Sequence, residues 1–134
     1  QLIYGTKGSG KTKRLLEMVN KEAETAQGDV IFIDDDKRYM YDLRHEIRFV
    51  DASEYSVKSA DMFLGFLSGM LSQNFDVTAI FIDAFMKMVN ADVSTLGDFF
   101  AQLDTLAEKR NLRFVISLSG DPDTMPEFMK KYVI

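Results

Sequence analysis

The chain has 134 residues and a formal net charge of −5, with 46% hydrophobic and 28% charged residues. These values are typical of one globular domain with a buried core, and they give no general attraction to nucleic acid or to an anionic membrane. The chain has no cysteine, which excludes disulfides, zinc-thiolate sites and thiol catalysis. The longest apolar block, residues 62–71, is about half of the roughly 20 residues that span a bilayer. We therefore expect a single cytoplasmic domain over residues 1–134, without a membrane span or an evident nucleic-acid patch.

Short apolar runs between turn residues predict buried strands. These runs occupy residues 2–4, 30–34, 79–83 and 113–118, and a weaker, alternating run at 47–51 predicts a strand nearer the edge of a sheet. Continuous runs such as VIFID are typical of strands that are covered on both faces.

Helical periodicity separates these strands along the chain. It predicts a helix from residue 11 to about 26 before Gly28, a helix over 59–73 capped by Ser59, a helix capped by Ser94 or Thr95 that runs to residue 110, and a short last helix over 127–132 with Pro126 at its start. The second helix is apolar nearly all round, so it is expected to be deeply buried or covered by a partner. Simple core packing and a homodimer are both open for it.

Strands that alternate with helices predict an α/β fold, a three-layer and mostly parallel sheet of about five strands with helices on both faces. Right-handed crossovers place the carboxyl ends of all strands at one edge of the sheet. Ligands bind at this edge in open sheets of this kind. Any functional residues are therefore expected just after the strands.

Eight residues after the first predicted strand match the phosphate-binding pattern G-x-x-x-x-G-K-(S/T) without departure. They are Gly5, Thr6, Lys7, Gly8, Ser9, Gly10, Lys11 and Thr12. Glycines allow a positive φ, so that successive N–H groups turn inward around an anion, and a side chain at Gly8 or Gly10 is expected to obstruct the phosphate or the turn. Lys11 supplies a charge to the β- and γ-phosphates, and the Thr12 hydroxyl is placed to bind Mg²⁺. We expect this segment to bind a nucleoside triphosphate.

A nucleotide-bound Mg²⁺ usually needs an Asp at the end of a second strand, often acting through water. Two runs end in this way, VIFID at Asp34 and AIFID at Asp83. We expect Asp83 to hold the metal together with Thr12, because its strand follows at least one further helix. Asp34, Asp35 and Asp36 form an acidic cluster, which is either a solvated turn or a group that supports the metal or orients a substrate.

These two motifs resemble those of the P-loop NTPase superfamily. The resemblance implies a nucleoside-triphosphate site, with Lys11 and Thr12 in the roles given above and Asp83 as the Walker B residue. The length and the order of motifs also look like small firmicute ATP-binding proteins of unassigned role. A fainter likeness is to RecA-like ATPases, whose sensor strand often ends in a polar residue that Ser117 or Ser119 could match.

A second faint likeness is to small thymidine kinases. It is carried by VIFIDDDKRYMYDLRH, AIFIDAF and SGDPD, which fall in a similar order. Where both of these families have a catalytic Glu after the Walker B Asp, this chain has Ala84, and the zinc-lobe cysteines of the kinases are absent. No N-K-x-D motif occurs, which favours adenine over guanine.

The residue at position 84 decides which activity we expect. Positioning, a metal and charge neutralisation are provided, but no base stands at a diagnostic spacing to orient the nucleophile. The open candidates are Asp35, Glu54 and Asp121, and the candidate arginine fingers are Arg38, Arg44 and Arg110. We expect a Mg-ATP-binding switch or regulator with weak or partner-stimulated ATPase activity, in which Lys11 and Asp83 carry the catalysis. A small-molecule or nucleoside kinase and a non-catalytic nucleotide-binding or interaction module are the alternatives, and a homodimer or a regulatory protein would be the partner.

Overall fold

The computed structural model describes all residues, 1–134, and contains one five-stranded sheet in which every neighbouring pair of strands is parallel. The strand order is β1-β5-β4-β2-β3. The strands are β1 (Leu2–Gly5), β2 (Asp29–Asp34), β3 (Arg48–Asp51), β4 (Val77–Ile82) and β5 (Arg113–Ser119). The predicted α/β fold with about five parallel strands is confirmed, and the alternating run at 47–51 is the edge strand β3.

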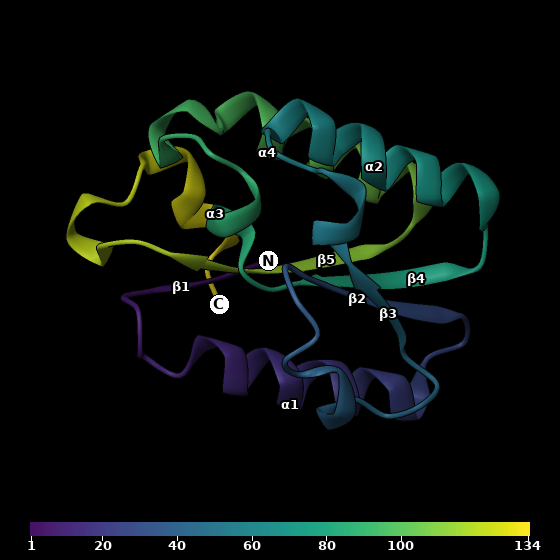
Figure 1. Cartoon of the computed structure of the whole chain (residues 1–134). Coiled ribbons are helices and arrows are strands. Elements are labelled where there is room, and N and C mark those ends of the chain that lie inside the picture. The colour runs from purple at the N-terminus through teal and green to yellow at the C-terminus, as the bar shows by residue number, and fades with distance from the viewer.

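Helices cover both faces of the sheet, as predicted (Figure 1). The helix α1 (Lys11–Thr25) lies on one face, whereas α2 (Ala60–Gln73) and α4 (Gly97–Arg110) lie on the other. A single turn, α3 (Phe85–Met88), follows β4 closely. The 3₁₀ turns are η1 (Met40–Asp42), η2 (Ala52–Tyr55), η3 (Val93–Thr95), η4 (Pro122–Thr124) and η5 (Glu127–Tyr132). None of these helices has the length and apolar character needed to cross a membrane.

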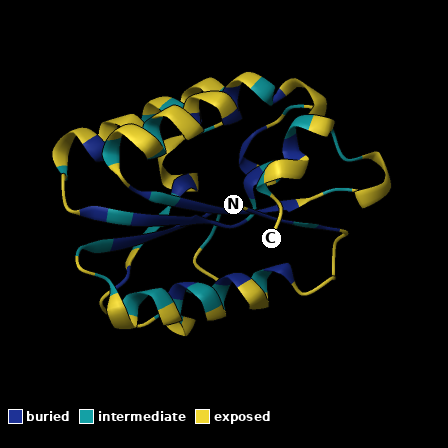
Figure 2. Ribbon diagram, turned by 180° about the vertical axis from the view of Figure 1, so that it is seen from behind, coloured by how far each residue is buried: buried dark blue, intermediate teal, exposed yellow.

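Two separate cores explain why the central strands read as continuous apolar runs. In β2, Val30 and Phe32 belong to the core beneath α1, whereas Ile31 and Ile33 belong to the larger core beneath α2 and α4. Successive side chains of a strand point to opposite faces, so a strand covered on both sides has no polar positions. Figure 2 shows the buried residues along the strands and on the inward sides of the helices. Polar chemistry is thus confined to the ends of the strands.

The ends of the helices follow the sequence signals only in part. Ser59 caps α2 as predicted, because its Oγ accepts a hydrogen bond from the Met62 amide at 3.1 Å. The predicted cap of α4 by Ser94 or Thr95 is wrong. Asp92 accepts the Ser94 amide at 2.9 Å and holds both residues inside η3, so α4 begins only at residue 97. The last predicted helix is the 3₁₀ segment η5, and Pro126 precedes it as the N-cap.

The helix α2 is buried on one side and open on the other. Phe63, Leu67 and Leu71 are buried in the larger core. At Gly65 and Gly69, an added Cβ would meet no atom within 4 Å. Burial of the whole helix within one chain is therefore wrong, and the homodimer stays a prediction.

Candidate functional site

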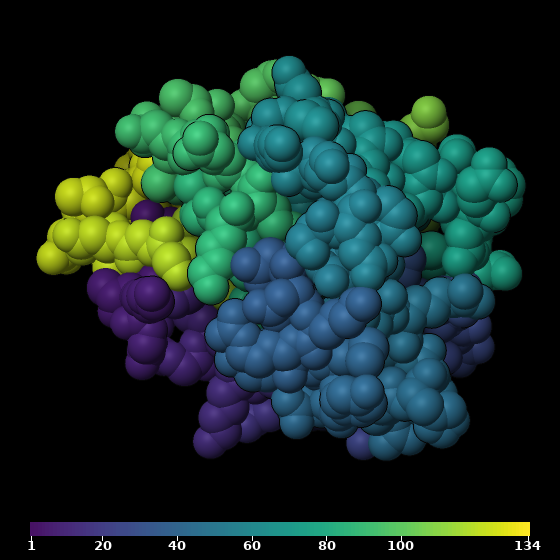
Figure 3. Space-filling model, viewed as in Figure 1, coloured from purple at the N-terminus to yellow at the C-terminus, as the bar shows by residue number.

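All of the buried polar or charged residues of this protein line one cleft. They are Lys11, Asp34, Asp83 and Ser117. The cleft has a volume of about 570 Å³ and lies at the carboxyl ends of the strands. In Figure 3 the segments that follow β1, β2 and β4, coloured purple, blue and green, meet on one face of the molecule. Burying polar groups is unfavourable unless they are bound by a partner, so their concentration here marks the cleft as the candidate site.

The turn between β1 and α1 depends on glycine for its backbone conformation. Gly8 and Gly10 both have a φ of 84°, in the left-handed region that other residues adopt only at a cost. An added Cβ at either position would meet no protein atom within 4 Å, so a side chain would disturb the turn through this φ rather than by a clash with the protein. Obstruction of a phosphate by such a side chain stays a prediction. At Gly5, by contrast, a Cβ would lie 2.8 Å from Ser9 Oγ. Gly8 and Gly10 therefore set the shape of the turn, and Gly5 allows the turn to close tightly against Ser9.

Several N–H groups of this turn have no acceptor in the protein. The Ser9 amide donates to the Thr6 carbonyl at 3.2 Å, but the amides of Lys7, Gly8 and Gly10 donate to no protein group. Gly10 is also the N-cap of α1 and offers no side-chain cap, so the first amides of the helix are free as well. Free amides and the positive end of a helix together form an anion-binding concavity.

Lys11 lies inside the turn rather than in solvent. Its ammonium donates to the Thr6 carbonyl at 2.8 Å, and the residue is only 9% exposed. Burial lowers the pKa of Lys11, and the negative charge of Asp83 opposes this shift. The single cation that is fixed within the turn therefore stands beside its unpaired amides.

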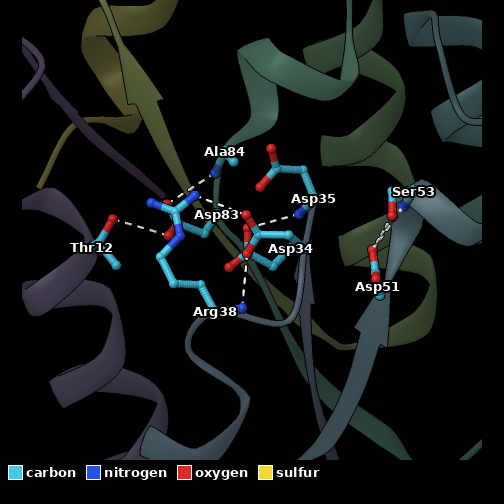
Figure 4. Close-up of polar contacts among 9 residues, drawn as sticks. Thr12, Asp34, Asp35, Arg38, Asp51, Ser53, Asp83 and Ala84 are labelled. Carbon is cyan, nitrogen blue, oxygen red and sulfur yellow. Dashed lines mark hydrogen bonds and ion pairs between the residues drawn. The ribbon is translucent and has the colours of Figure 1, made fainter.

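Thr12, at the start of α1, and Asp83, just after β4, come together although β5 separates β4 from β1, the strand that leads into α1. The Thr12 hydroxyl donates to Asp83 Oδ2 at 3.0 Å (Figure 4). The other oxygen, Oδ1, accepts the Ala84 amide at 2.9 Å, which fixes the orientation of the carboxylate. Hydroxyl and carboxylate oxygens are the ligands that Mg²⁺ prefers, so this pair has the chemistry of a magnesium site.

Asp34 and Asp35 line the same cleft from the end of β2. Asp34 is 2% exposed, and burial, followed by the nearby Asp35 carboxyl, raises the pKa of Asp34 to about 8. Asp35 is half-buried. Asp36 turns away to an ion pair of 2.8 Å with Arg38. The interpretation of this cluster as a solvated turn is therefore wrong for Asp34.

Only one of the three carboxylates that were open as bases lies in the cleft. That residue is Asp35. Glu54 forms an ion pair of 2.8 Å with Lys37, and Asp121 caps η4 by accepting the Asp123 amide at 2.9 Å. These two carboxylates have local structural roles and do not line the cleft.

Only one of the three candidate arginines lies in the cleft. Arg38 lines the cleft. Arg44 is engaged with Glu46 at 2.9 Å, and Arg110 donates to the Leu71 carbonyl at 2.9 Å behind α2. Arg38 is therefore the only one of the three that can reach a ligand in this cleft of the same chain.

Sequence reasoning missed the short helix α3 and the residues that it brings to the cleft. The turn begins at Ala84, whose φ of 56° is left-handed, and it places Phe85, Met86 and Lys87 along the wall. Tyr39, after β2, also lines the cleft. A glycine at position 84 would have signalled this turn, whereas an alanine gives no such signal.

No protein-family model matches this chain, and no curated protein is significantly similar to it. Function is therefore inferred from the chemistry of the cleft. Its three informative parts are the turn with its unpaired amides, the Thr12–Asp83 pair and the carboxylates that end β2.

Proposed function

We propose that the cleft binds a nucleoside triphosphate with Mg²⁺, and that the phosphates lie in the turn between β1 and α1. The observation that best supports this is the meeting of unpaired amides, an uncapped helix start and the Lys11 ammonium in one turn. All three attract the same ligand, a polyphosphate. The turn also carries the complete phosphate-binding pattern between a strand and a helix, which is the context that gives the pattern its meaning.

Each residue of the motif then has a role. The unpaired amides of Lys7, Gly8 and Gly10 and the first amides of α1 bind phosphate oxygens, and Lys11 neutralises charge on the β- and γ-phosphates. Thr12 and Asp83 would hold Mg²⁺, Asp83 through water, because their oxygens already lie 3.0 Å apart at the start of α1. When bound, this ion supplies further charge neutralisation on the phosphates.

We infer that the nucleotide is ATP and that the protein is related to the P-loop NTPase superfamily. The absence of an N-K-x-D motif supports adenine over guanine. Ser117 and Ser119 near the end of β5 line the cleft, where a sensor residue would face the γ-phosphate.

The activity that fits this cleft is slow or partner-stimulated hydrolysis of ATP by a switch or regulator. Ala84 provides no carboxylate after Asp83, and the loss of a positioned base costs about 10²–10⁴-fold in rate. Asp35 is the carboxylate in the cleft that would orient the attacking water. A regulatory protein that contributes a base or an arginine to the cleft would then raise this low intrinsic turnover.

A second candidate function is a kinase for a nucleoside or another small molecule. The cleft continues from the phosphate loop to Arg38 and Tyr39, which offer a guanidinium and an aromatic ring to an acceptor. A third candidate, a nucleotide-binding module without catalysis, is supported by Ala84 alone. Steady-state phosphate release separates hydrolysis from binding, and labelled ATP with a panel of nucleosides reveals a kinase.

The proposal is tested by calorimetry with a non-hydrolysable ATP analogue and Mg²⁺. Lys11→Ala removes a charge-assisted contact and should cost about 2 kcal/mol or more, a rise in Kd of about 30-fold. Lys21→Ala is the matched control, because it removes the same charge from an exposed position of the same helix and should bind as the wild type does. Equal affinity of the wild type and Lys11→Ala would defeat the assignment.

A further inference from the structure

Two carboxylate oxygens at the end of β2 are buried and have no hydrogen-bond partner. They are Asp34 Oδ2 and Asp35 Oδ1, and no other buried side-chain oxygen or nitrogen of the protein lacks a partner. The remaining oxygen of Asp34 accepts the Asp35 amide at 2.7 Å, which holds the two side chains in place. A buried, unpaired polar atom in a folded protein calls for an explanation, and a bound ion is one of the established ones.

The geometry of the cluster suits a small cation. The ligand atoms of Asp34, Asp35 and Asp36 lie within 4.8 Å of one another. Asp36 is committed to Arg38, because its Oδ1 accepts the Arg38 amide and its Oδ2 pairs with the guanidinium, both at 2.8 Å. The oxygens that remain free to bind a cation therefore belong to Asp34 and Asp35, and both residues line the cleft.

No positive side chain of the protein forms an ion pair with Asp34 or Asp35. Of the cations that line the cleft, Lys11 donates to a carbonyl of the phosphate loop and Arg38 is paired with Asp36. The other cations of the lining, Lys7, Lys13 and Lys87, form no ion pair with either carboxylate. Asp83, at the end of the adjacent strand β4, adds a further negative charge next to Asp34. Carboxylates gathered in this way are stabilised by a cation or by a shared proton.

We propose that Asp34 and Asp35 form a divalent-cation site that is separate from the Thr12–Asp83 pair and does not require nucleotide. Mg²⁺, and Mn²⁺ as its substitute, is the class of ion that fits. Mg²⁺ keeps several waters and is commonly held by one or two carboxylates, whereas Ca²⁺ takes six to eight oxygen ligands. The cleft beside the two carboxylates is roomy enough for those waters, at about 570 Å³.

The test measures the binding of Mn²⁺ alone to the full chain without nucleotide. Binding is monitored through the electron paramagnetic resonance signal of the free ion. The wild type should bind Mn²⁺, and Asp34→Asn should raise the Kd at least about tenfold. Asp36→Asn is the matched control, because it removes the same charge from the same cluster and should change the Kd no more than about threefold. Asp83→Asn should weaken Mn²⁺ binding less than Asp34→Asn does, because Asp83 contributes only its nearby negative charge to this site. This difference separates the site from the one proposed for the nucleotide's metal.

Two results would overturn the proposal. The first is no Mn²⁺ binding by the wild type between pH 6 and 8, which would mean that a proton shared by the two carboxyls satisfies them. The second is binding that survives in Asp34→Asn but is lost in Asp83→Asn. If Asp34→Asn does not melt cooperatively, Asp35→Asn, at a half-buried position, replaces it with the same expected loss. Because nucleotide is absent throughout, failure here leaves the nucleotide assignment untouched.

Discussion

The buried carboxyl of Asp34 should make this protein less stable as the pH rises. Its pKa is raised to about 8 in the fold, mainly by burial, whereas an aspartate in an unfolded chain has a pKa of about 3.9. The unfolded chain therefore releases this proton near pH 4, and the folded protein keeps it until near pH 8. Because the folded state binds more protons within this window, the free energy of unfolding falls as the pH rises through it.

The expected magnitude follows from the width of that window. Each pH unit inside it costs about 1.4 kcal/mol, so the contribution of Asp34 falls by about 2–3 kcal/mol between pH 5 and pH 7. Asp34→Asn keeps the shape of the side chain and removes the titration. Urea denaturation of the two proteins, in EDTA to remove divalent cations, gives the difference in unfolding free energy at each pH. Between pH 5 and pH 7, the unfolding free energy of Asp34→Asn should rise relative to that of the wild type by about 2–3 kcal/mol.

The control for this experiment is Asp36→Asn. The pKa of Asp36 is lowered by its hydrogen bonds to Arg38, so the stability that it contributes is present above about pH 4 and is lost only in acid. Its difference curve should therefore be flat between pH 5 and pH 7. A flat curve for Asp34→Asn as well, or one that favours the wild type as the pH rises, would refute the assignment of a buried, uncompensated carboxyl at the end of β2.

Three further predictions concern the turn, the core and the metal ligand. Gly10→Ala should lower the free energy of unfolding by about 1–2 kcal/mol, because the φ of Gly10 is 84°. Gly65→Ala, on the open face of α2, should raise it by about 0.5–1 kcal/mol. Similar melting curves for both variants would contradict the role of the positive φ. Phe63→Ala should lower the free energy of unfolding, measured by urea denaturation, by about 3–5 kcal/mol, because the Phe63 ring is fully buried. Phe75→Ala, at a residue that is 82% exposed, should lower it by less than about 1 kcal/mol. A small loss for Phe63→Ala would mean that the larger core is not packed as described. Asp83→Asn should reduce at least about tenfold the gain in ATP-analogue affinity that Mg²⁺ gives the wild type in calorimetry, and an unchanged Mg²⁺ dependence would remove this carboxylate from the metal site.

The fold could be predicted from sequence because its signals are local. A run such as that of β2 is apolar at every position only when both faces of the strand are covered, and this is the observed arrangement. The cap at Ser59 is likewise decided within one turn of helix. By contrast, Ser94 and Thr95 are good capping residues, but Asp92 holds them inside η3, and α4 begins at Gly97 without a side-chain cap. Residue preference alone does not resolve such a competition between neighbours.

The candidate site could be predicted only where one short segment contains it. The phosphate-binding pattern lies within eight consecutive residues, and it points to the observed turn without any knowledge of the sheet. The burial of Asp34 depends on β4 lying beside β2, and the cleft residues of β5 depend on that strand lying between β1 and β4. Such strand neighbours are set by long-range packing, so a cluster of three aspartates reads from sequence as a solvated turn.

The central claim, that the turn between β1 and α1 holds a triphosphate, is tested most directly by a crystal structure with a non-hydrolysable ATP analogue and Mg²⁺. We expect the β- and γ-phosphates within the turn, at hydrogen-bond distance from the amides of Gly8 and Gly10, with the Lys11 ammonium beside them and the metal next to Thr12 and Asp83. A turn that stays empty at saturating analogue, or a nucleotide bound elsewhere on the protein, would contradict the account.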